Sequence, residues 1–250
     1  MTGPSSRSAR LGVGIIGAGA VGPVLGAALA GAGHAITGIS AISERSRDRA
    51  EAMLPRVPVL PIPEVIERSE LVLLAVPEPE LAGLVAGLAA TGAWQPGQLV
   101  VHTAARHGVR VLSPATAAGC IPLAIHPAMS FTGTSLDLAR LSESYFAVTA
   151  PAPVQPIGQA LVVEMGGEPI IVGEADRVLY AEAIATASDF SSAIVAQATG
   201  MLASLGIGEP GLVLGPLVRS SVENALARAT SGGAGHDTAH RFEVEPEEGE

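Results

Sequence analysis

Apolar residues in this chain fall into short unbroken runs, separated by segments in which apolar positions recur with helical spacing. Such runs, bounded by Gly or polar residues, are typical of strands buried on both faces of a sheet. They occupy residues 11–16, 35–40, 57–60, 71–76 and 99–103. Helices are predicted between them, at residues 21–31, 45–53, 63–69 and 81–90. This alternation predicts right-handed βαβ units and a parallel sheet covered on both faces.

The pattern continues less regularly to residue 173 and then changes. Strands are predicted at 121–125, 145–149 and 168–172, and a helix at 156–165. Residues 175–205 and 212–229 have helical periodicity, and a helix is predicted over each range. We expect an α/β fold: a Rossmann-type, doubly wound, mostly parallel sheet over residues 11–173, followed by a smaller all-helical unit over 174–230. Segments 1–10 and 231–250 lack periodicity, and we expect both to be disordered.

The first predicted strand runs directly into the sequence GAGAVG, which matches the pattern G-x-G-x-x-G. A buried strand before it and an Ala-rich helix after it make this pattern typical of a dinucleotide-binding turn. The first Gly allows the tight turn, the second lets a pyrophosphate approach the backbone, and the third allows helix and strand to pack closely. The helix N-terminus attracts the phosphates. The expected cofactor-binding residues are Gly17, Ala18, Gly19, Ala20, Val21 and Gly22; the alternative is a Gly-rich turn without a ligand.

The residues at the end of the second predicted strand indicate whether a site of this kind prefers NADP or NAD. A site for NAD usually places Asp or Glu there to hold the ribose hydroxyls. Here the sequence reads GISAIS, without a carboxylate. Ser40, Ser43, Arg45 and Arg47 are instead expected around a 2′-phosphate, with Arg supplying charge-assisted hydrogen bonds. We therefore predict NADP rather than NAD. Glu44 argues for NAD, and the alternative for both Arg residues is an ordinary solvated helix face.

Two further strand ends are expected to line the cofactor. Ligands of open α/β sheets bind outside the carboxyl ends of the strands. Ala75, Val76 and Pro77 end one strand, and His102 and Thr103 end the next. We expect these residues to contact the cofactor mainly through backbone and small side chains.

Composition and charge exclude several classes of function. The 250 residues carry a net charge of −10, which argues against a nucleic-acid surface. All basic residues are Arg, so no mechanism can use a catalytic Lys. Cys120 is the single cysteine and is expected to be a buried apolar residue, which fits a cytoplasmic protein. Residues 11–43 are uncharged and resemble a signal peptide or membrane helix, but the spaced glycines favour a strand, turn and helix, so we expect no membrane association.

Four segments together resemble one protein family: GIIGAGAVG, LLAVPEPEL, VVHTAARHG and IHPAMSFTG. That family joins a Rossmann-like N-terminal half to a C-terminal domain of unknown function 2520. The chain more distantly resembles pyrroline-5-carboxylate reductase, ketopantoate reductase and prephenate dehydrogenase, of 6-phosphogluconate-dehydrogenase-like design. The resemblance implies NADP-dependent reduction, and a helical half that completes the active site and often forms a dimer.

The chain departs from the family pattern at three places. It has His-Thr-Ala-Ala at residues 102–105 where the family often has HTSG-like residues, and Asp189 where Asn is common. The family also continues with more helix where this chain becomes a tail, so we expect a shortened helical unit. These departures bear on the expected catalysis more than on the expected nucleotide binding.

His126 is the first candidate for catalysis. Hydride reduction needs an aligned substrate and a group that polarises or protonates the reduced atom. His126 ends an apolar strand before Pro127, and a His-Pro at a comparable place contacts substrate in the prephenate-dehydrogenase-like relatives. Ser130 and Thr132 follow in a polar loop that could bind a substrate carboxylate. The alternatives are a His that caps the strand and hydroxyls that form turns.

Asp189 is the second catalytic candidate. It lies in a predicted helix of apolar and small residues, where a buried carboxylate would need a cleft or a partner. The alternative is a solvated helix face. The spacing of His102, His107 and His126 fits no compact metal motif, and His236 and His240 fall in the predicted tail, so no metal site is expected.

These observations favour an NADP(H)-dependent oxidoreductase that reduces a C=O or C=N bond of a small-molecule substrate. A non-catalytic NAD(P)-binding sensor, or degenerate dehydrogenase, is the alternative. A third interpretation is an interaction protein that forms a homodimer through the helices after residue 174. The fold by itself does not choose among them.

Overall fold

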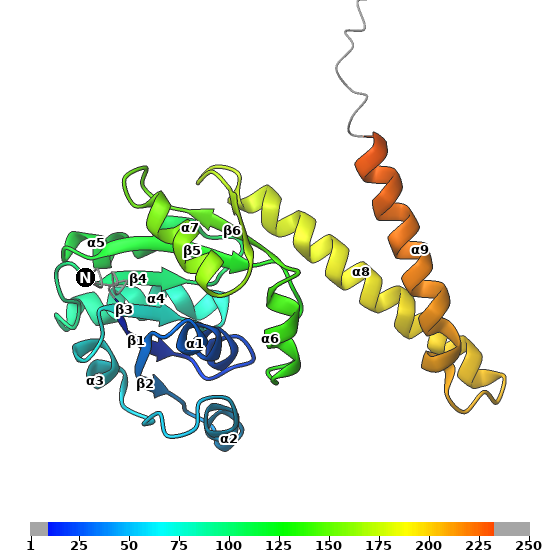
Figure 1. Ribbon diagram of the computed structural model, residues 1–250, viewed down its shortest axis with the longest axis horizontal. Helices are drawn as coiled ribbons and strands as arrows, with labels where there is room; N and C mark the ends of the chain where they lie inside the picture. The colour runs from blue at the N-terminus through cyan, green and yellow to red at the C-terminus, as the bar shows by residue number, and fades with distance from the viewer. Residues whose placement is uncertain (1–9, 233–250) are drawn as a thin grey trace, which may run out of the picture. The chain divides into compact units, whose positions relative to one another are not determined.

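The apolar runs of the sequence form the strands of one seven-stranded sheet (Figure 1). A computed structural model of the protein describes residues 10–232. The strand order is β2-β1-β3-β4-β5-β6-β7, and all neighbours are parallel except β5 and β6. The strands are β1 (Gly12–Ile16), β2 (Ala35–Ser40), β3 (Leu71–Leu74), β4 (Leu99–His102), β5 (Ile121–Pro127), β6 (Tyr145–Thr149) and β7 (Glu168–Ile171).

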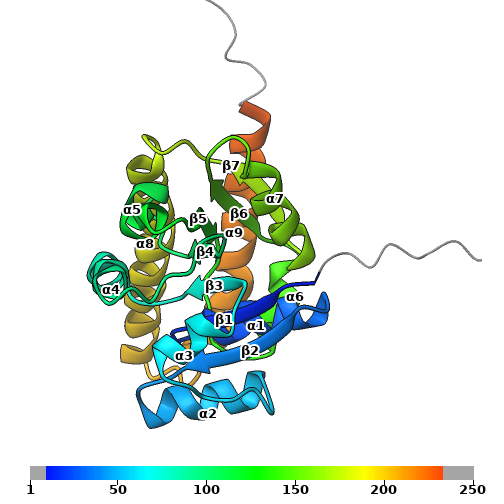
Figure 2. The same cartoon turned by 90° about the vertical axis from the view of Figure 1, so that its left-hand side faces the viewer.

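Successive residues of each central strand face opposite sides of the sheet, so both sides need a cover. In β3, Leu71 and Leu73 pack into one core and Val72 and Leu74 into the other. The first core lies under α1 (Gly22–Gly31), α6 (Leu136–Leu141) and α7 (Gln155–Glu164). The second lies under α3 (Ile62–Glu67), α4 (Glu78–Ala90), η1 (Val109–Leu112) and α5 (Ser113–Ala117). Figure 2 shows α4 and α5 on one side of the sheet and α1 and α7 on the other, which confirms the predicted α/β fold.

The prediction of a strand at residues 57–60 was wrong. This segment makes a single parallel bridge, between Val59 and Ile39. Pro58 and Pro61 flank the bridge, and Pro has no N–H to donate to a ladder. The segment therefore crosses from α2 (Glu44–Met53) to α3 with two backbone hydrogen bonds to Ile39.

The uncharged stretch at residues 11–43 forms β1, α1 and β2, within the α/β fold. Among the described helices, only α8 (Arg177–Ser204) is long and apolar enough to cross a membrane by length and composition. A single helix of this kind is weak evidence for a span.

The described part of the chain divides into two compact units, with the division between Ala185 and Thr186. The division lies inside α8 rather than at the expected 173/174 boundary, because Arg177 and Ala181 in its first turns are buried in the first unit. The predicted disordered segments lie outside the described residues, except for Arg10 and the end of α9 (Pro210–Gly232), where residues 231 and 232 are helical.

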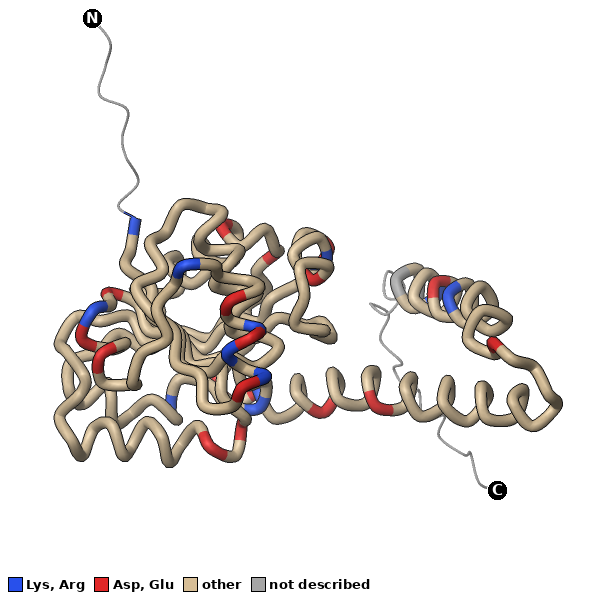
Figure 3. The backbone as a smooth tube through the Cα atoms, turned by 90° about the horizontal axis from the view of Figure 1, so that it is seen from below, with Lys and Arg blue, Asp and Glu red and all other residues tan. Residues whose placement is uncertain are grey.

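The second unit consists of the remainder of α8 and of α9. Its helices carry few charged residues (Figure 3). Instead they expose large apolar side chains: Phe190, Ile194, Met201, Leu212, Val213, Leu217, Val222 and Leu226. Apolar surface of this extent is rarely left exposed on monomeric proteins.

Candidate functional site

The glycine-rich turn between β1 and α1 is closely packed on one side and open on the other. Gly17 has a φ of +108°, and a Cβ there would lie 2.3 Å from the backbone oxygen of Ala75. A Cβ on Gly22 would lie 2.1 Å from the oxygen of Gly17. A Cβ on Gly19 would meet nothing within 4 Å, and this residue is exposed. The outer glycines are therefore needed by the fold, whereas Gly19 leaves the backbone open to a ligand.

A cavity of about 420 Å³ opens at this turn. It is lined by Ile16, Gly17, Ala18, Gly19, Ser40, Ile42, Ser43, Ser46, Ile62, Ala75, Val76, Pro77, Glu80 and Leu84. The structure thus brings together the predicted residues of the turn, the β2 end and the β3 end. Ala20, Val21, Gly22, His102 and Thr103 do not line it.

Serine side chains surround the far end of this cavity, where β2 leads into α2. Ser43 caps α2: its Oγ accepts a hydrogen bond from the Ser46 N–H at 3.2 Å, and its own N–H donates to Ser46 Oγ at 3.0 Å. Ser40 also lines an adjoining cavity of about 480 Å³, together with Arg47. Arg45 lines neither cavity. An anion at this end would meet hydroxyls, a helix N-terminus and one guanidinium.

The loop between β5 and α6 is folded around the fully buried carboxylate of Asp137. That carboxylate accepts hydrogen bonds at 2.8 Å from the N–H groups of Thr132 and Gly133, and at 3.0 Å from Thr132 Oγ1. Burial raises the pKa of Asp137, but these hydrogen bonds outweigh it and hold the pKa below its usual value. The Thr132 hydroxyl is therefore engaged in a hydrogen bond to Asp137 within the loop, whereas Ser130 is exposed.

This loop packs against the glycine-rich turn. Gly133 has a φ of +76°, and a Cβ there would lie 3.1 Å from Ala20 Cα and 2.6 Å from Arg49 Nε. Asp137 thus fixes a backbone segment beside the proposed phosphate site, although residues 129–134 carry no sequence motif that predicts this.

His102 is a structural residue in the interior. Its Nδ1 accepts from the Ala104 N–H at 3.2 Å, so its Nε2 carries the proton and donates to the Gly108 oxygen at 2.9 Å. Burial is the main cause that lowers the pKa of His102 to about 4, and the side chain stays neutral near neutral pH. His102 thus holds the loop that follows β4 through its bonds to Ala104 and Gly108. The backbone of this loop, rather than the His102 side chain, lies at the carboxyl edge of the sheet.

His126 lies near the carboxyl end of β5, beyond the level at which β4 ends. Its Nδ1 is 2.8 Å from Tyr180 Oη, and the two rings meet edge to face. The Arg177 guanidinium lies 5.8 Å from the centre of the Tyr180 ring. Burial, and secondly Arg177, lower the pKa of His126 to about 4. These three side chains form what we call the His126 cluster.

The sequence did not single out Arg177 or Tyr180. Both lie on α8, three residues apart, a spacing that places side chains on one face of a helix. That spacing, on an otherwise apolar helix, was the available signal. Asp189, the second catalytic candidate, lies in the other compact unit and is exposed, so its role stays a prediction.

Charged side chains form a rim beside the His126 cluster. Arg106, in the loop after β4, lies 3.8 Å from carboxylate oxygens of Glu78 on α4 and Glu182 on α8. His107 Nε2 is 4.0 Å from Glu78. Within residues 10–232, no group of three or more His, Cys, Asp or Glu side chains could hold a metal ion.

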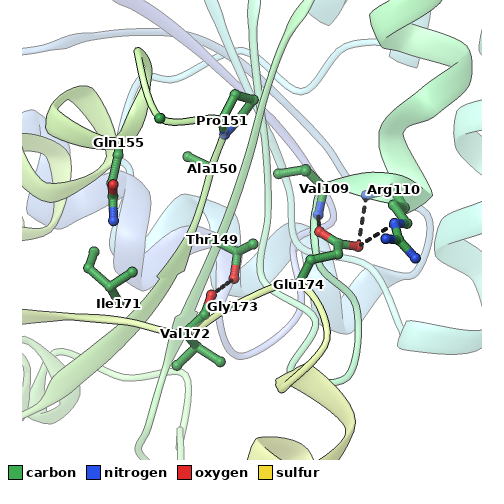
Figure 4. A pocket seen from close by; sticks show the side chains of 11 residues that line it. Val109, Arg110, Thr149, Ala150, Pro151, Gln155, Ile171, Val172, Gly173 and Glu174 are labelled. Carbon is green, nitrogen blue, oxygen red and sulfur yellow. Dashed lines mark hydrogen bonds and ion pairs between the residues drawn. The ribbon is translucent and has the colours of Figure 1, made fainter.

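A further cavity, of about 460 Å³, lies where β6 and β7 end and holds none of the predicted site residues (Figure 4). Glu174 points from it to η1 and accepts hydrogen bonds from the N–H groups of Val109 at 2.7 Å and Arg110 at 3.2 Å. Thr149 Oγ1 donates to the Val172 oxygen. These contacts connect the chain before α8 to η1 and to β6.

Comparison with known proteins agrees with this architecture. The model of a Rossmann-like domain matches residues 1–127, half of the chain, and the strand-turn-helix unit described above falls within it. The chain belongs to the Rossmann-like domain family. Residues 144–234 match the domain of unknown function DUF2520. The Rossmann-like domain thus supplies β1 to β5, and DUF2520 covers β6, β7 and the long helices.

Solved structures share the fold at low sequence identity. One is described as a "putative NADP oxidoreductase" from Bacteroides fragilis: TM-score 0.72, 19% identity, covering 86% of this chain and 80% of that one. A reductive aminase from Aspergillus terreus has a TM-score of 0.65 and 17% identity, covering 93% and 80%. A 1-pyrroline-5-carboxylate reductase from Streptococcus pyogenes has a TM-score of 0.62 and 19% identity, covering 93% and 83%. No curated protein sequence matches the chain.

Proposed function

We propose that this protein is an NADP(H)-dependent oxidoreductase that reduces a C=O or C=N bond of a small metabolite. The observation that carries the proposal is the space above Gly19, where a Cβ would meet no atom within 4 Å although the flanking glycines are closely packed. Backbone N–H groups at the start of a helix, with no side chain in front of them, suit a pyrophosphate. The related structures named above are described as a putative NADP oxidoreductase, a reductive aminase and a 1-pyrroline-5-carboxylate reductase, which supports the choice.

The preference for NADP rests on the end of β2. Ser40, Ser43 and Ser46 lie there, and Arg47 lines the adjoining cavity. The one charged side chain in the cavity lining at the turn is Glu80, on α4 rather than at the β2 end. A 2′-phosphate would gain hydrogen bonds from these hydroxyls and the guanidinium, whereas the ribose hydroxyls of NAD would lack their usual carboxylate.

When bound, NADPH would supply a hydride. The chain would hold the cofactor along the carboxyl edge of the sheet. In the order β1, β3, β4 and β5, that edge runs from Gly17 past Ala75 and the loop at Thr103 to His126. The adenosine end of the cofactor fits the β2 side, and the substrate fits the side of the His126 cluster. Ser130 and Arg106 border that side and are proposed to meet a substrate carboxylate.

A pair of matched variants tests cofactor binding. Gly19→Ala places a methyl group where the pyrophosphate is proposed to lie, whereas Gly31→Ala places one in open space at the other end of α1. We expect NADPH to raise the melting temperature of the wild type and of Gly31→Ala, but not of Gly19→Ala. NADH should give a smaller shift. Equal shifts in all three proteins would contradict the proposed pyrophosphate site.

Turnover is tested by following NADPH absorbance with panels of 2-oxo acids, ketones and cyclic imines. Oxidation of NADPH with at least one class is expected. Tight NADPH binding without oxidation by any panel member would contradict the enzyme and favour the second candidate, a non-catalytic NADP-binding sensor.

We further propose that the protein is a cytoplasmic homodimer that pairs through α8 and α9. The exposed apolar side chains of these helices support this proposal. Light scattering should give twice the monomer mass, and Leu217→Asp with Val213→Asp should reduce it. A monomeric wild type at micromolar concentration would contradict the dimer.

A further inference from the structure

We propose that Tyr180 is the proton donor of this site, and that His126 and Arg177 are positioning residues that act through it. The inference deepens the proposed reductase and rests on it. It replaces the prediction that His126 itself protonates the substrate.

The argument begins with a single hydrogen bond. Tyr180 Oη and His126 Nδ1 are 2.8 Å apart, and their rings meet at 80° with centres 5.5 Å apart. Tyr180 is half-buried, so the residue is neither fully exposed to solvent nor enclosed in the core. In the tautomer that carries its proton on Nδ1, His126 donates to the phenol oxygen. The phenol hydrogen is then free to point at a substrate.

His126 by itself is a weak choice for the donor. Burial and the charge of Arg177 keep it neutral, with a pKa of about 4. A neutral imidazole with that pKa holds no second proton to give near neutral pH. A tyrosine hydroxyl, in contrast, remains protonated across that range. The other familiar donor, Lys, does not occur in the chain.

Arg177 supplies the charge that such a donor needs. It is fully buried and makes four hydrogen bonds: Nε donates to Thr149 Oγ1 at 2.7 Å, Nη2 to the oxygens of Ala124 at 2.9 Å and Ala147 at 3.0 Å, and Nη1 to that of Ala105 at 3.5 Å. Among the described residues, no carboxylate lies within ion-pair distance of it. Its positive charge is therefore stabilised by the dipoles of these acceptors and by the longer-range charge of Glu174, and it lies 5.8 Å from the centre of the Tyr180 ring.

This charge favours the product of proton transfer. Burial raises the pKa of Tyr180, and Arg177 lowers it. As the hydroxyl gives up its proton, the phenolate is stabilised by the nearby guanidinium and by a hydrogen bond from His126 Nδ1. Arg177 on α8 and His126 on β5 act directly on Tyr180. Two further titratable groups act on these partners: Glu174 on Arg177, and His102 on β4, which interacts with Arg177 and His126.

The proposed step balances in electrons and protons. A bound NADPH would supply the hydride for the new C–H bond, and the electron pair of the C=O or C=N bond would move to the heteroatom. That atom would take the proton from Tyr180 Oη, which would become a phenolate. After release of the reduced substrate and the oxidised cofactor, a proton from solvent would restore the phenol.

The chain contains two tyrosines, and the second provides a matched control. Tyr145 lies on β6 and is exposed. We expect Tyr180→Phe to lower kcat by about 100-fold or more, the usual contribution of a general acid, with an unchanged thermal shift on NADPH. Tyr145→Phe should match the wild type.

The outcomes separate the two proposals. Equal turnover in Tyr180→Phe and Tyr145→Phe overturns the proton donor and leaves the reductase in place. No turnover by the wild type, despite NADPH binding, overturns the reductase and this inference with it.

The positioning role of His126 has its own matched pair. The amide of His126→Asn can still donate to Tyr180 Oη, whereas His126→Phe cannot. We expect kcat to fall at least tenfold further in the Phe variant than in the Asn variant, with KM for NADPH unchanged in both. Equal kcat values would overturn this role.

For Arg177, the Lys variant keeps the charge and the Gln variant removes it. We expect kcat to be higher in Arg177→Lys, and the alkaline limb of its pH profile to lie at lower pH than in Arg177→Gln. If either Arg177 variant fails to fold, the comparison of His126→Asn with His126→Phe decides the proposal, because His126 is only half-buried.

Discussion

The two ends of the carboxyl edge of the sheet are built in opposite ways. At the β2–β1–β3 end, three consecutive residues of the glycine-rich turn, Gly17 to Gly19, line the cavity with backbone and at most a methyl group. At the β5 end, the His126 cluster joins side chains more than fifty residues apart, since His126 contacts Tyr180 at a separation of 54 positions. A site formed by the backbone of consecutive residues can be recognised from a local sequence motif. A site formed by side chains of distant elements is assembled only when the chain folds.

The largest expected effect lies within the glycine-rich turn itself. Gly17→Ala forces a residue at φ +108° to carry a Cβ 2.3 Å from backbone. Left-handed strain and overpacking together should cost roughly 3 kcal/mol of unfolding free energy. Gly19→Ala should cost less than about 1 kcal/mol, because its Cβ meets nothing. Urea unfolding of both variants measures this, and similar losses in the two would contradict the division into packed and open glycines.

The loop that connects the two ends should be nearly as sensitive. Asp137→Asn replaces a buried carboxylate that accepts hydrogen bonds from Thr132 and Gly133. Loss of charge-assisted hydrogen bonds should cost roughly 2 kcal/mol. NADPH affinity should also fall, because Gly133 packs beside Ala20. Urea unfolding and NADPH titration measure the two effects, with the exposed Asp189→Asn as control; an unaltered affinity would mean that the loop does not shape the cofactor site.

The buried histidine predicts an acid-dependent stability. His102 has a pKa of about 4 in the folded protein and about 6.5 when unfolded. Below the unfolded value the unfolded chain takes up a proton that the folded chain does not, so stability falls as the pH falls from about 6.5 to about 4. At pH 5 the loss from this one residue should be about 2 kcal/mol.

Urea unfolding at neutral pH and at pH 5 measures that loss. His102→Gln should be less stable than the wild type at neutral pH, yet lose less on acidification. The same decrease in both proteins would assign the acid sensitivity to other groups.

The smallest effect concerns the choice of cofactor. Arg47 lines the cavity next to Ser40, and Arg45 lines neither cavity. Arg47→Gln should weaken NADPH about tenfold, the scale of one charge-assisted hydrogen bond, and leave NADH unchanged. Arg45→Gln should alter neither. Calorimetric titration of both cofactors compares them, and a larger loss from Arg45→Gln would reverse the assignment.

Much of the fold could be predicted from local pattern. The strand at residues 145–149 and the β2 strand were predicted with their observed ends, because unbroken apolar runs are buried on both faces. The prediction of a strand at residues 57–60 failed because Pro58 and Pro61 interrupt this apolar run. Apolar residues and Pro can both pack in a core, but Pro has no N–H for the hydrogen-bond ladder of a sheet. The short helices η1, α5 and α6 lack enough turns to show a period, and the antiparallel pairing of β5 with β6 depends on the path of the chain between them.

By itself, the sequence determined the α/β fold and the glycine-rich turn, because both depend on properties of neighbouring residues: burial period, and the missing Cβ. Only the tertiary structure decided that Asp137 fixes the loop beside that turn, that His102 serves the interior, and that Tyr180 and Arg177 meet His126. Those arrangements depend on distances between residues far apart in the chain, which the packing of α6 and α8 onto the sheet creates.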